Sequence, residues 1–285
     1  MSVEALIGKQ NPDGGWPYRR GASWAEPTVY AVLSLLDGGQ SAPAARGIAW
    51  LKSLERSDGG WPPCAQVDES CWTTALVALI PQDALGEGAH RRAINWLVGA
   101  TGEESTFLHP LREWLLGHSE QAAARAPGWP WVPGSAAWVG PTSLAILALD
   151  RENRQHPSAA AAARVEQGRR FLLDRMCRGG GWNHGGSDPL GYSPAPYPET
   201  TGMALAGLRG CREPRVERSI GLARAYLDTC RSADAMNWLR LGMLAQQQLP
   251  AGFAAPAGIE YRTVPEIALN LLATAAGQGR NVFWA

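Results

Sequence analysis

The chain has 285 residues and a formal net charge of zero, with 26 basic and 26 acidic side chains. This balance, together with the absence of any run of Lys or Arg, argues against a nucleic-acid partner. No apolar stretch is long enough to span a bilayer, so only a peripheral contact with a membrane stays open.

Cysteine usage predicts a cytoplasmic protein. The five cysteines are odd in number and unevenly spaced, which favours reduced thiols over a disulfide framework. The first ten residues lack the charged, apolar and cleavage segments of a signal peptide. We expect no cofactor, and nothing in the sequence indicates an oligomeric state.

Taken in chain order, the elements repeat. Gly-Gly-Trp occurs three times, ending at Trp16, Trp61 and Trp182, and Trp129 in "APGWPWVP" is a weaker relative. Each is followed by a loop rich in Pro and Gly and then by a short apolar segment. Those segments are Glu26–Leu36, Cys71–Ile80, Gly140–Leu149 and Glu199–Leu208. Being apolar on nearly every face, they are predicted to be helices that are buried all round.

A second kind of helix precedes the turns. The segments Ala44–Glu55, His90–Gly99 and Val165–Met176 are amphipathic, with one polar stripe. Hydroxyl residues stand near the starts of the apolar helices, where they are predicted to cap free N–H groups. These are Thr28, Ser70, Thr142 and Thr200.

Alternating amphipathic and buried helices predict an all-α protein, an α/α toroid in which an outer ring of helices wraps an inner one. We expect about five to six helical hairpins in one domain covering residues 1–285. The third unit carries an insertion at about 106–126, predicted to be an extra helix. The fifth unit, Arg218–Leu249, keeps its helices and lacks Gly-Gly-Trp.

The repeat resembles the QW repeat of squalene–hopene and oxidosqualene cyclases. The matching residues are Arg46, Gly47, Trp50, Leu51, Glu55, Gly59 and Trp61, with Glu55 in place of Gln. The resemblance implies the toroid of the terpenoid cyclase and protein prenyltransferase superfamily. In that family the repeat fastens the fold, so it does not imply a particular activity.

Class II terpenoid cyclases carry Asp-x-Asp-Asp-Thr-Ala at the start of one inner helix, and its middle Asp protonates an alkene or epoxide. This chain does not contain that motif. Aligned by the following helix, the middle Asp falls on Glu26, Ser70, Gly140 or Glu199. The nearest text match, Gln66–Cys71, offers Asp68 and Glu69 but is shifted by two residues.

The resemblance therefore makes Glu26, Asp68, Glu69 and Glu199 candidate general acids, because inner-helix starts share one face of a toroid. A general acid must be held protonated by burial or by a like charge. A helix start favours the ionised form instead, so the alternative is that each is a structural cap. Tyr30, Trp72, Trp138 and Trp238 are candidates to line a central cavity that stabilises cations, with core packing as their alternative.

Protein prenyltransferases hold zinc with Asp-x-Cys and a later His. Glu69 and Cys71 imitate the first part, but Gly140 and Glu199 occupy the places where the His is expected. Zinc needs a complete set of ligands, so we expect no metal site. The thioester motif of complement-type toroids is also absent.

We expect a terpene cyclase-like protein that binds or cyclises a small apolar, isoprenoid ligand, by class II-type protonation if it is an enzyme. Two alternatives stand beside it. One is a non-catalytic isoprenoid-binding or scaffold toroid that lost the acid. The other is a carbohydrate-active α/α barrel, which would need a polar groove and two suitably spaced carboxylates.

Overall fold

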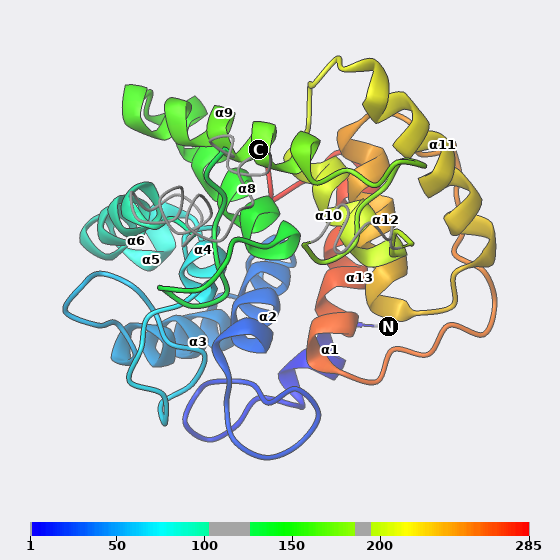
Figure 1. The fold of residues 1–285 in the computed structure, drawn as a ribbon. Helices are drawn as coiled ribbons and strands as arrows, with labels where there is room; N and C mark the ends of the chain where they lie inside the picture. Colours follow the sequence, from blue (N-terminus) through cyan, green and yellow to red (C-terminus); the bar gives the residue numbers. More distant parts are fainter. Residues whose placement is uncertain (1, 103–125, 186–194, 285) are drawn as a thin grey trace.

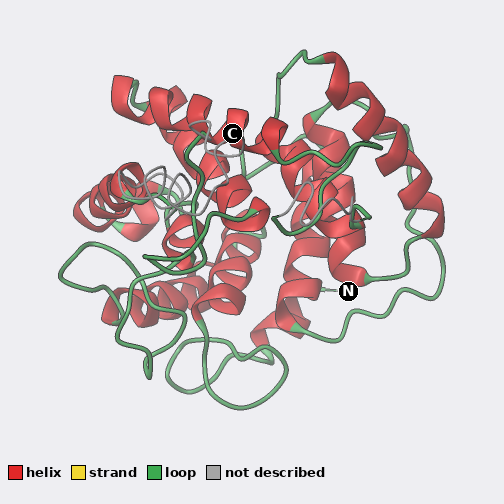
Figure 2. Cartoon of the chain, in the orientation of Figure 1, coloured by secondary structure: helices red, strands yellow, loops and turns green. Residues whose placement is uncertain are grey.

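The computed structural model describes residues 2–102, 126–185 and 195–284, and this part of the chain is helical (Figure 2). Its helices are α1 Val3–Ile7, α2 Ala25–Asp37, α3 Ser41–Ser53, α4 Thr73–Val77, α5 Gln82–Leu85, α6 Glu87–Gly99, α8 Val139–Gln155, α9 Ala159–Asp174, α10 Pro198–Gly207, α11 Pro214–Thr229, α12 Ala233–Ala245 and α13 Val264–Gly277. Extended structure in these residues is limited to two isolated bridges, Trp16 with Trp24 and Pro130 with Ala137. The all-α prediction is confirmed. The predicted extra helix lies, except for Ala126, outside the described residues.

Six helices form a closed inner ring. In ring order α2, α4, α8, α10, α12 and α13 each pack on the next, and α13 packs back on α2. The helices α3, α6, α9 and α11 lie around them (Figure 1). Ten of the thirteen residues of α2 are buried, against six of the sixteen in the outer helix α9. The predicted inner and outer layers are thus present.

The tryptophans of the turns hold each unit together. All four indoles are buried, and each Nε1 donates to a leucine carbonyl in the preceding helix, at 2.6–2.8 Å. The pairs are Trp16 with Leu6, Trp61 with Leu51, Trp129 with Leu97 and Trp182 with Leu172. In the third unit the pair is 32 residues apart instead of 10, so the bond is kept across the additional segment.

Hydroxyl groups of the inner helices complete the turns. The backbone N–H of each Trp donates to a threonine Oγ1 at 2.8–3.1 Å; the acceptors are Thr28, Thr74, Thr142 and Thr201. The prediction that Thr28, Ser70, Thr142 and Thr200 cap their helices is wrong, because α2, α4, α8 and α10 have no side-chain cap. The hydroxyls of Thr28, Thr142 and Thr200 instead bond to backbone groups of the turn, which would otherwise be buried without partners, and that of Ser70 donates to the carboxylate of Asp58.

Glycine is required where two units touch. Gly59 has a φ of 83°, and a Cβ there would lie 3.0 Å from Arg92 of the next unit. Arg92 Nε in turn donates to Glu55 Oε1 at 2.5 Å, and Arg46 pairs with Gln10 in the same way one unit earlier. The turn thus joins each unit to its successor through a backbone shape that only glycine adopts readily.

Backbone bonds link four of the six inner helices to the loop of a neighbouring unit. The first residue of the helix, or for α4 the residue before it, donates to a carbonyl two residues after the tryptophan of that unit, at 2.8–3.0 Å. The bonds run from Ala25 to Pro63, Trp72 to Trp131, Val139 to His184, and Val264 to Tyr18. The last of these joins the first loop of the chain to its final helix and closes the ring.

Aromatic side chains pack between the inner helices. Tyr30 and Trp238 meet edge to face with ring centroids 6.5 Å apart, and each is only 2 % exposed. Phe283 covers the other side of Trp238 at 5.9 Å and is 1 % exposed. Within the described ranges no helix combines the length and apolar character needed to cross a membrane.

Candidate active site

Acidic residues gather at the N-terminal ends of the inner helices. Four helices begin with one: Glu26 in α2, Glu199 in α10, Asp234 in α12 and Glu266 in α13. Because the inner helices run parallel, these first turns share one face of the ring. The charges of Glu26, Glu199 and Glu266 all act on Asp234. The structure thus brings together two predicted residues, Glu26 and Glu199, with two that were not predicted.

Glu266 is a structural cap. Its Oε2 accepts from the backbone N–H of Arg262 at 2.6 Å and of Thr263 at 2.7 Å, and the hydroxyl of Thr263 accepts from the N–H of Glu266. This is a capping box, which serves to satisfy helix-terminal N–H groups. Neither Glu26 nor Glu199 does this, since α2 and α10 have no side-chain cap.

Glu26 accepts a hydrogen bond from the phenol of Tyr18. Burial raises the pKa of Glu26 to about 7; the bond from Tyr18 opposes this rise and the charge of Glu199 adds to it. Burial also raises the pKa of Tyr18, as does the charge of Glu26, so the phenol keeps its proton and remains the donor. Near neutral pH Glu26 therefore exchanges a proton readily.

Asp234 lies at the start of α12, where the hydroxyl of Ser232, not Asp234, caps the helix. Burial raises the pKa of Asp234 to about 8, helped by the charges of Glu199, Glu26 and then Glu266. Among the described residues none donates a hydrogen bond to its carboxyl group. Desolvation and like charge, acting together, keep this carboxyl mainly protonated at neutral pH.

The charge of Glu199 acts on both Glu26 and Asp234. Burial raises the pKa of Glu199, and the charge of His184 opposes the rise. His184 is exposed and its ring lies 5.1 Å from that of Tyr197, the residue before α10. His184 therefore lies beside the acid cluster.

Asp68 and Glu69 do not join the cluster. Both are exposed, and the side chain of Asp68 is 96 % accessible and pairs with Arg56. Nothing there shields a carboxyl group from water, whereas a general acid needs such shielding to keep its proton. The geometry therefore favours Glu26 and Glu199 among the four predicted acids.

The chain is similar to known proteins in part of its sequence and in its fold. The sequence matches no protein-family model. Over 134 residues, 46 % of this chain and 22 % of the relative, it is 31 % identical to the uncharacterized protein y4kT of Sinorhizobium fredii. Over 124 residues, 37 % of this chain and 18 % of the relative, it is 25 % identical to squalene–hopene cyclase of Zymomonas mobilis. The chain thus spans about a fifth of the length of these curated relatives.

Two solved structures share the whole architecture. A GH8 endo-β-1,4-glucanase from an Achatina fulica gut metagenomic library has a TM-score of 0.62 at 13 % identity, with 98 % of both chains covered. Type II terpene cyclase MstE from Scytonema, in complex with geranylgeranyl dihydroxybenzoate, has a TM-score of 0.56 at 15 % identity, covering 97 % of this chain and 80 % of that one. The chain has the α/α-toroid fold. This confirms the fold that the repeats predicted.

The four predicted aromatic residues of the toroid fall into two classes. Tyr30 and Trp238 belong to the closed core and do not stand on the wall of an open cavity. Trp72 and Trp138 are half-buried at the acid face. Trp72 meets the ring of Trp131 at right angles, 4.9 Å between centroids. Tyr30 and Trp238 are therefore packed in the core, and half-buried aromatic surface remains at the acid face.

Exposed apolar side chains surround the acid face. In the described part of the toroid the large apolar residues with the most exposure are Tyr18 (37 %), Val67 (38 %), Val132 (40 %) and Tyr197 (48 %). Each lies in a different loop that leads into an inner helix, namely α2, α4, α8 and α10. Trp24 is also half-buried there, with its ring 5.8 Å from that of Tyr18. An apolar ligand would find its contacts on this face.

Metal chemistry has no visible support in the described residues, where no group of three or more His, Cys, Asp or Glu is placed to hold an ion. Cys71 is buried, and burial raises the pKa of its thiol although hydrogen bonding to Thr73 opposes this. Zinc binds the thiolate, so this environment does not favour a ligand at Cys71.

Asp234 is the functional candidate that the sequence did not reveal. The fifth unit lacks Gly-Gly-Trp, so the start of its inner helix could not be located by the repeat. The signal that was available is "RSADAMNW", in which Ser232 precedes an apolar helix and Asp234 lies two residues later. A serine in that position is a common helix start.

Proposed function

We propose that this toroid is a Brønsted-acid catalyst that protonates an apolar isoprenoid substrate at the N-terminal face of its inner ring. The observation that carries the proposal is the set of interacting carboxyl groups Glu26, Glu199 and Asp234, of which Asp234 has a pKa of about 8 and Glu26 of about 7. Acids that retain a proton at neutral pH are what alkene protonation requires.

In the proposed reaction Asp234 or Glu26 adds its proton to one carbon of an alkene. The neighbouring carbon becomes a cation, the next alkene of the same chain attacks it, and a carbon–carbon bond closes the ring. The final cation loses a proton to a base, and the carboxylate is protonated again. Substrate and product therefore have the same elemental composition.

The surroundings of the acids suit such a substrate. Aromatic rings attract cations through their π faces, by about 0.5–2 kcal/mol each. Trp72, Trp131 and Trp138 are half-buried and Tyr18 and Tyr197 exposed near the acids. The relation to the terpene cyclase MstE, whose own substrate is a geranylgeranyl compound, supports an isoprenoid of that class here.

The test is incubation of the protein with linear oligoprenyl alcohols and aryl oligoprenyl compounds in D₂O, followed by mass spectrometry. Each turnover should place one deuterium on carbon and give a product one mass unit heavier. Glu26→Gln and Asp234→Asn should each lower the rate by about 10²–10⁴-fold, the usual contribution of general acid catalysis. The rate should also fall as pH rises above about 8, because both acids are then ionised.

Asp68→Asn is the matched control, since that carboxyl group is solvated and should leave the rate unchanged. Binding of the same compounds, measured by tryptophan fluorescence, separates the remaining outcomes. Binding without deuterium incorporation would make the toroid a non-catalytic isoprenoid-binding protein. If the protein neither binds nor converts these compounds, the proposal of an isoprenoid ligand is wrong.

A carbohydrate substrate is the second candidate. Glycoside hydrolysis also uses one protonated carboxyl group beside an ionised one, and raised pKa values at Glu26 and Asp234 would serve it. The GH8 endo-β-1,4-glucanase with the same architecture suggests β-1,4-glucan as the polymer to try. Release of reducing ends that Glu26→Gln abolishes would favour this reading over the cyclase.

A further inference from the structure

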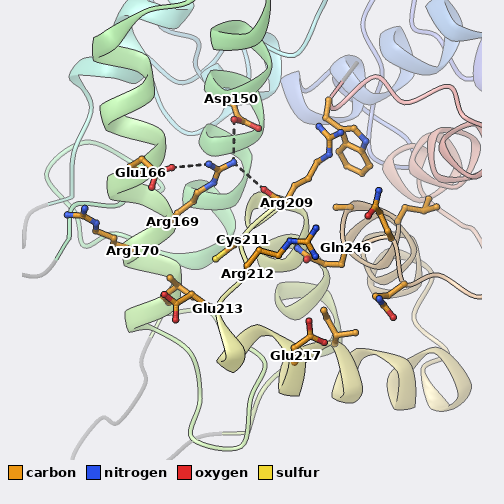
Figure 3. Close-up of a pocket in the computed structure, with 18 of the residues that line it drawn as sticks. Asp150, Glu166, Arg169, Arg170, Arg209, Cys211, Arg212, Glu213, Glu217 and Gln246 are labelled. Carbon is orange, nitrogen blue, oxygen red and sulfur yellow. Dashed lines mark hydrogen bonds and ion pairs between the residues drawn. The ribbon is translucent and has the colours of Figure 1, made fainter.

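A polar groove lies at the C-terminal ends of inner helices, whereas the acids lie at their N-terminal ends. Figure 3 shows the side chains that line this groove. Its volume is about 890 Å³, and it lies between the C-terminal parts of α8 and α12, the segment that follows α10, and the outer helices α9 and α11. Five of its lining residues are arginines: Arg154, Arg169, Arg170, Arg209 and Arg212. This site is separate from the proposed acid chemistry and does not depend on it.

Arginine side chains converge around one carboxylate. Arg169 contacts Asp150 at 3.3 Å and Glu166 at 2.9 Å, and Arg154 pairs with the same Asp150. The charges of Arg154 and Arg169 both act on Arg209, and Asp150 only partly offsets them. The five arginines of the groove are accompanied by four acids, Asp150, Glu166, Glu213 and Glu217, which leaves an excess of one positive charge.

Arg209 is held in place without an ionic partner. Its guanidinium lies over the indole of Trp284, 5.6 Å from the ring centroid. Burial, and then the charge of Arg154, lower the pKa of Arg209, which means that its surroundings disfavour the cation. Among the described residues, the side chains of Arg209 and of the neighbouring Arg170 and Arg212 donate no hydrogen bond and form no ion pair.

A structural role explains part of the group. Arginines near helix C-termini satisfy the last carbonyls. Arg169 does so, by donating to the carbonyl of Arg209 at 3.3 Å, and Arg154 donates to that of Trp284 at 2.9 Å. Arg209 and Arg212 have no such acceptor, so this role leaves their presence unexplained.

We propose that the groove is a binding site for a small anionic molecule carrying a phosphate or diphosphate group, held by Arg209, Arg169 and Arg212. The planar donor fork of arginine matches phosphate oxygens in pairs. The volume of the groove suits a small ligand. Of the remaining acids, Glu213 is turned to Arg215 at 3.8 Å, and Glu213 and Glu217 lie away from Asp150 (Figure 3).

The test is isothermal titration of the full chain with inorganic diphosphate, and with inorganic phosphate, at low ionic strength. We expect saturable binding of diphosphate that weakens with added salt, because charged contacts are screened. Arg209→Gln should weaken binding at least about tenfold, and Arg209→Lys should weaken it less, since it keeps the charge and loses the fork.

The control is Arg91→Gln on α6, an exposed arginine with its own partner Glu87 at 3.9 Å. It removes the same charge elsewhere and should bind diphosphate as the natural protein does. Far-UV circular dichroism confirms that all variants are folded. The proposal is overturned by an absence of binding, by equal affinities of Arg209→Gln and Arg91→Gln, or by Arg209-dependent sedimentation with acidic vesicles when free diphosphate does not bind.

Discussion

Two acidic residues at helix starts, Glu266 and Asp234, show how neighbours decide the behaviour of identical functional groups. Glu266 accepts backbone N–H groups of Arg262 and Thr263 and completes a cap. Asp234 receives no hydrogen bond from the described residues, and burial together with three other carboxyl groups raises its pKa to about 8. Glu266 therefore stabilises the start of its helix, whereas Asp234 keeps its proton at neutral pH.

The raised pKa of Asp234 predicts how the stability of the fold depends on pH. The pKa of Asp234 is higher in the folded state than its ordinary value of 3.8, so the folded chain binds more protons than the unfolded chain between about pH 4 and pH 8. The free energy of unfolding should therefore fall as pH rises through this window. In Asp234→Asn the free energy of unfolding should fall less steeply with pH. Between pH 5 and pH 8 it should be about 1–3 kcal/mol higher than in the natural protein.

Urea unfolding at a series of pH values measures this effect. Asp68→Asn provides the comparison, because its side chain is 96 % accessible and should leave the pH profile as it is. If Asp234→Asn has the same pH profile as the natural protein, Asp234 is not the buried acid described here. Glu26 contributes a smaller fall of the same sign, with a pKa of about 7.

At the scale of elements, the inner ring depends on one close helix crossing. α10 and α12 touch through Gly202 and Gly242; a Cβ on Gly242 would overlap the carbonyl oxygen of Gly202. A Cβ on Gly202 would in turn overlap the backbone of Trp238. This approach places the first turns of both helices, and so Glu199 and Asp234, on the same side of the ring.

Gly242→Ala should therefore separate α10 from α12 and lower the free energy of unfolding by about 1–3 kcal/mol, the usual cost of overpacking. Gly221→Ala in α11 is the matched control, because no atom lies within 4 Å of its added Cβ. It should raise stability by about 0.5–1 kcal/mol through helix propensity. Thermal unfolding of both variants tests the close contact between α10 and α12. Equal melting temperatures would contradict it.

At the scale of the whole molecule, closure of the ring joins the beginning of the chain to its end. The backbone N–H of Val264 donates to the carbonyl of Tyr18, and Ser34 in α2 donates to the carbonyl of Ala268 in α13 at 3.0 Å. Each inner helix is covered on both sides by its neighbours, so removing any one exposes apolar surface on two others.

We accordingly expect residues 1–285 to unfold as a single unit. Urea titrations followed by far-UV circular dichroism and by tryptophan fluorescence should give coincident transitions, the signature of a two-state process. The tryptophans at Trp16, Trp61, Trp129 and Trp182 lie in four different units, so fluorescence samples most of the ring. Two separated transitions would show that part of the ring folds independently.

Much of the frame could be predicted from the sequence because its signals are local. A glycine and an indole recur shortly before an apolar helix, and the bonds from Trp61 to Leu51 and Thr74 span only 10 and 13 residues. The third unit, interrupted by its insertion, and the fifth, without its turn, were recognised through their helices. The same helices indicated Glu26 and Glu199, because a helix start can be read from the chain.

The sequence by itself thus determined the all-α repeat, the alternation of inner and outer helices, and the approximate starts of the inner helices that follow a tryptophan turn. Only the tertiary structure decided that Asp234 joins Glu26 and Glu199, that Asp68 faces water, and that Tyr30 and Trp238 pack against each other in the core. The physical reason is that burial and charge interaction depend on segments far apart in the chain. A turn is specified by its own residues, whereas a pKa is set by whatever the fold brings beside the group.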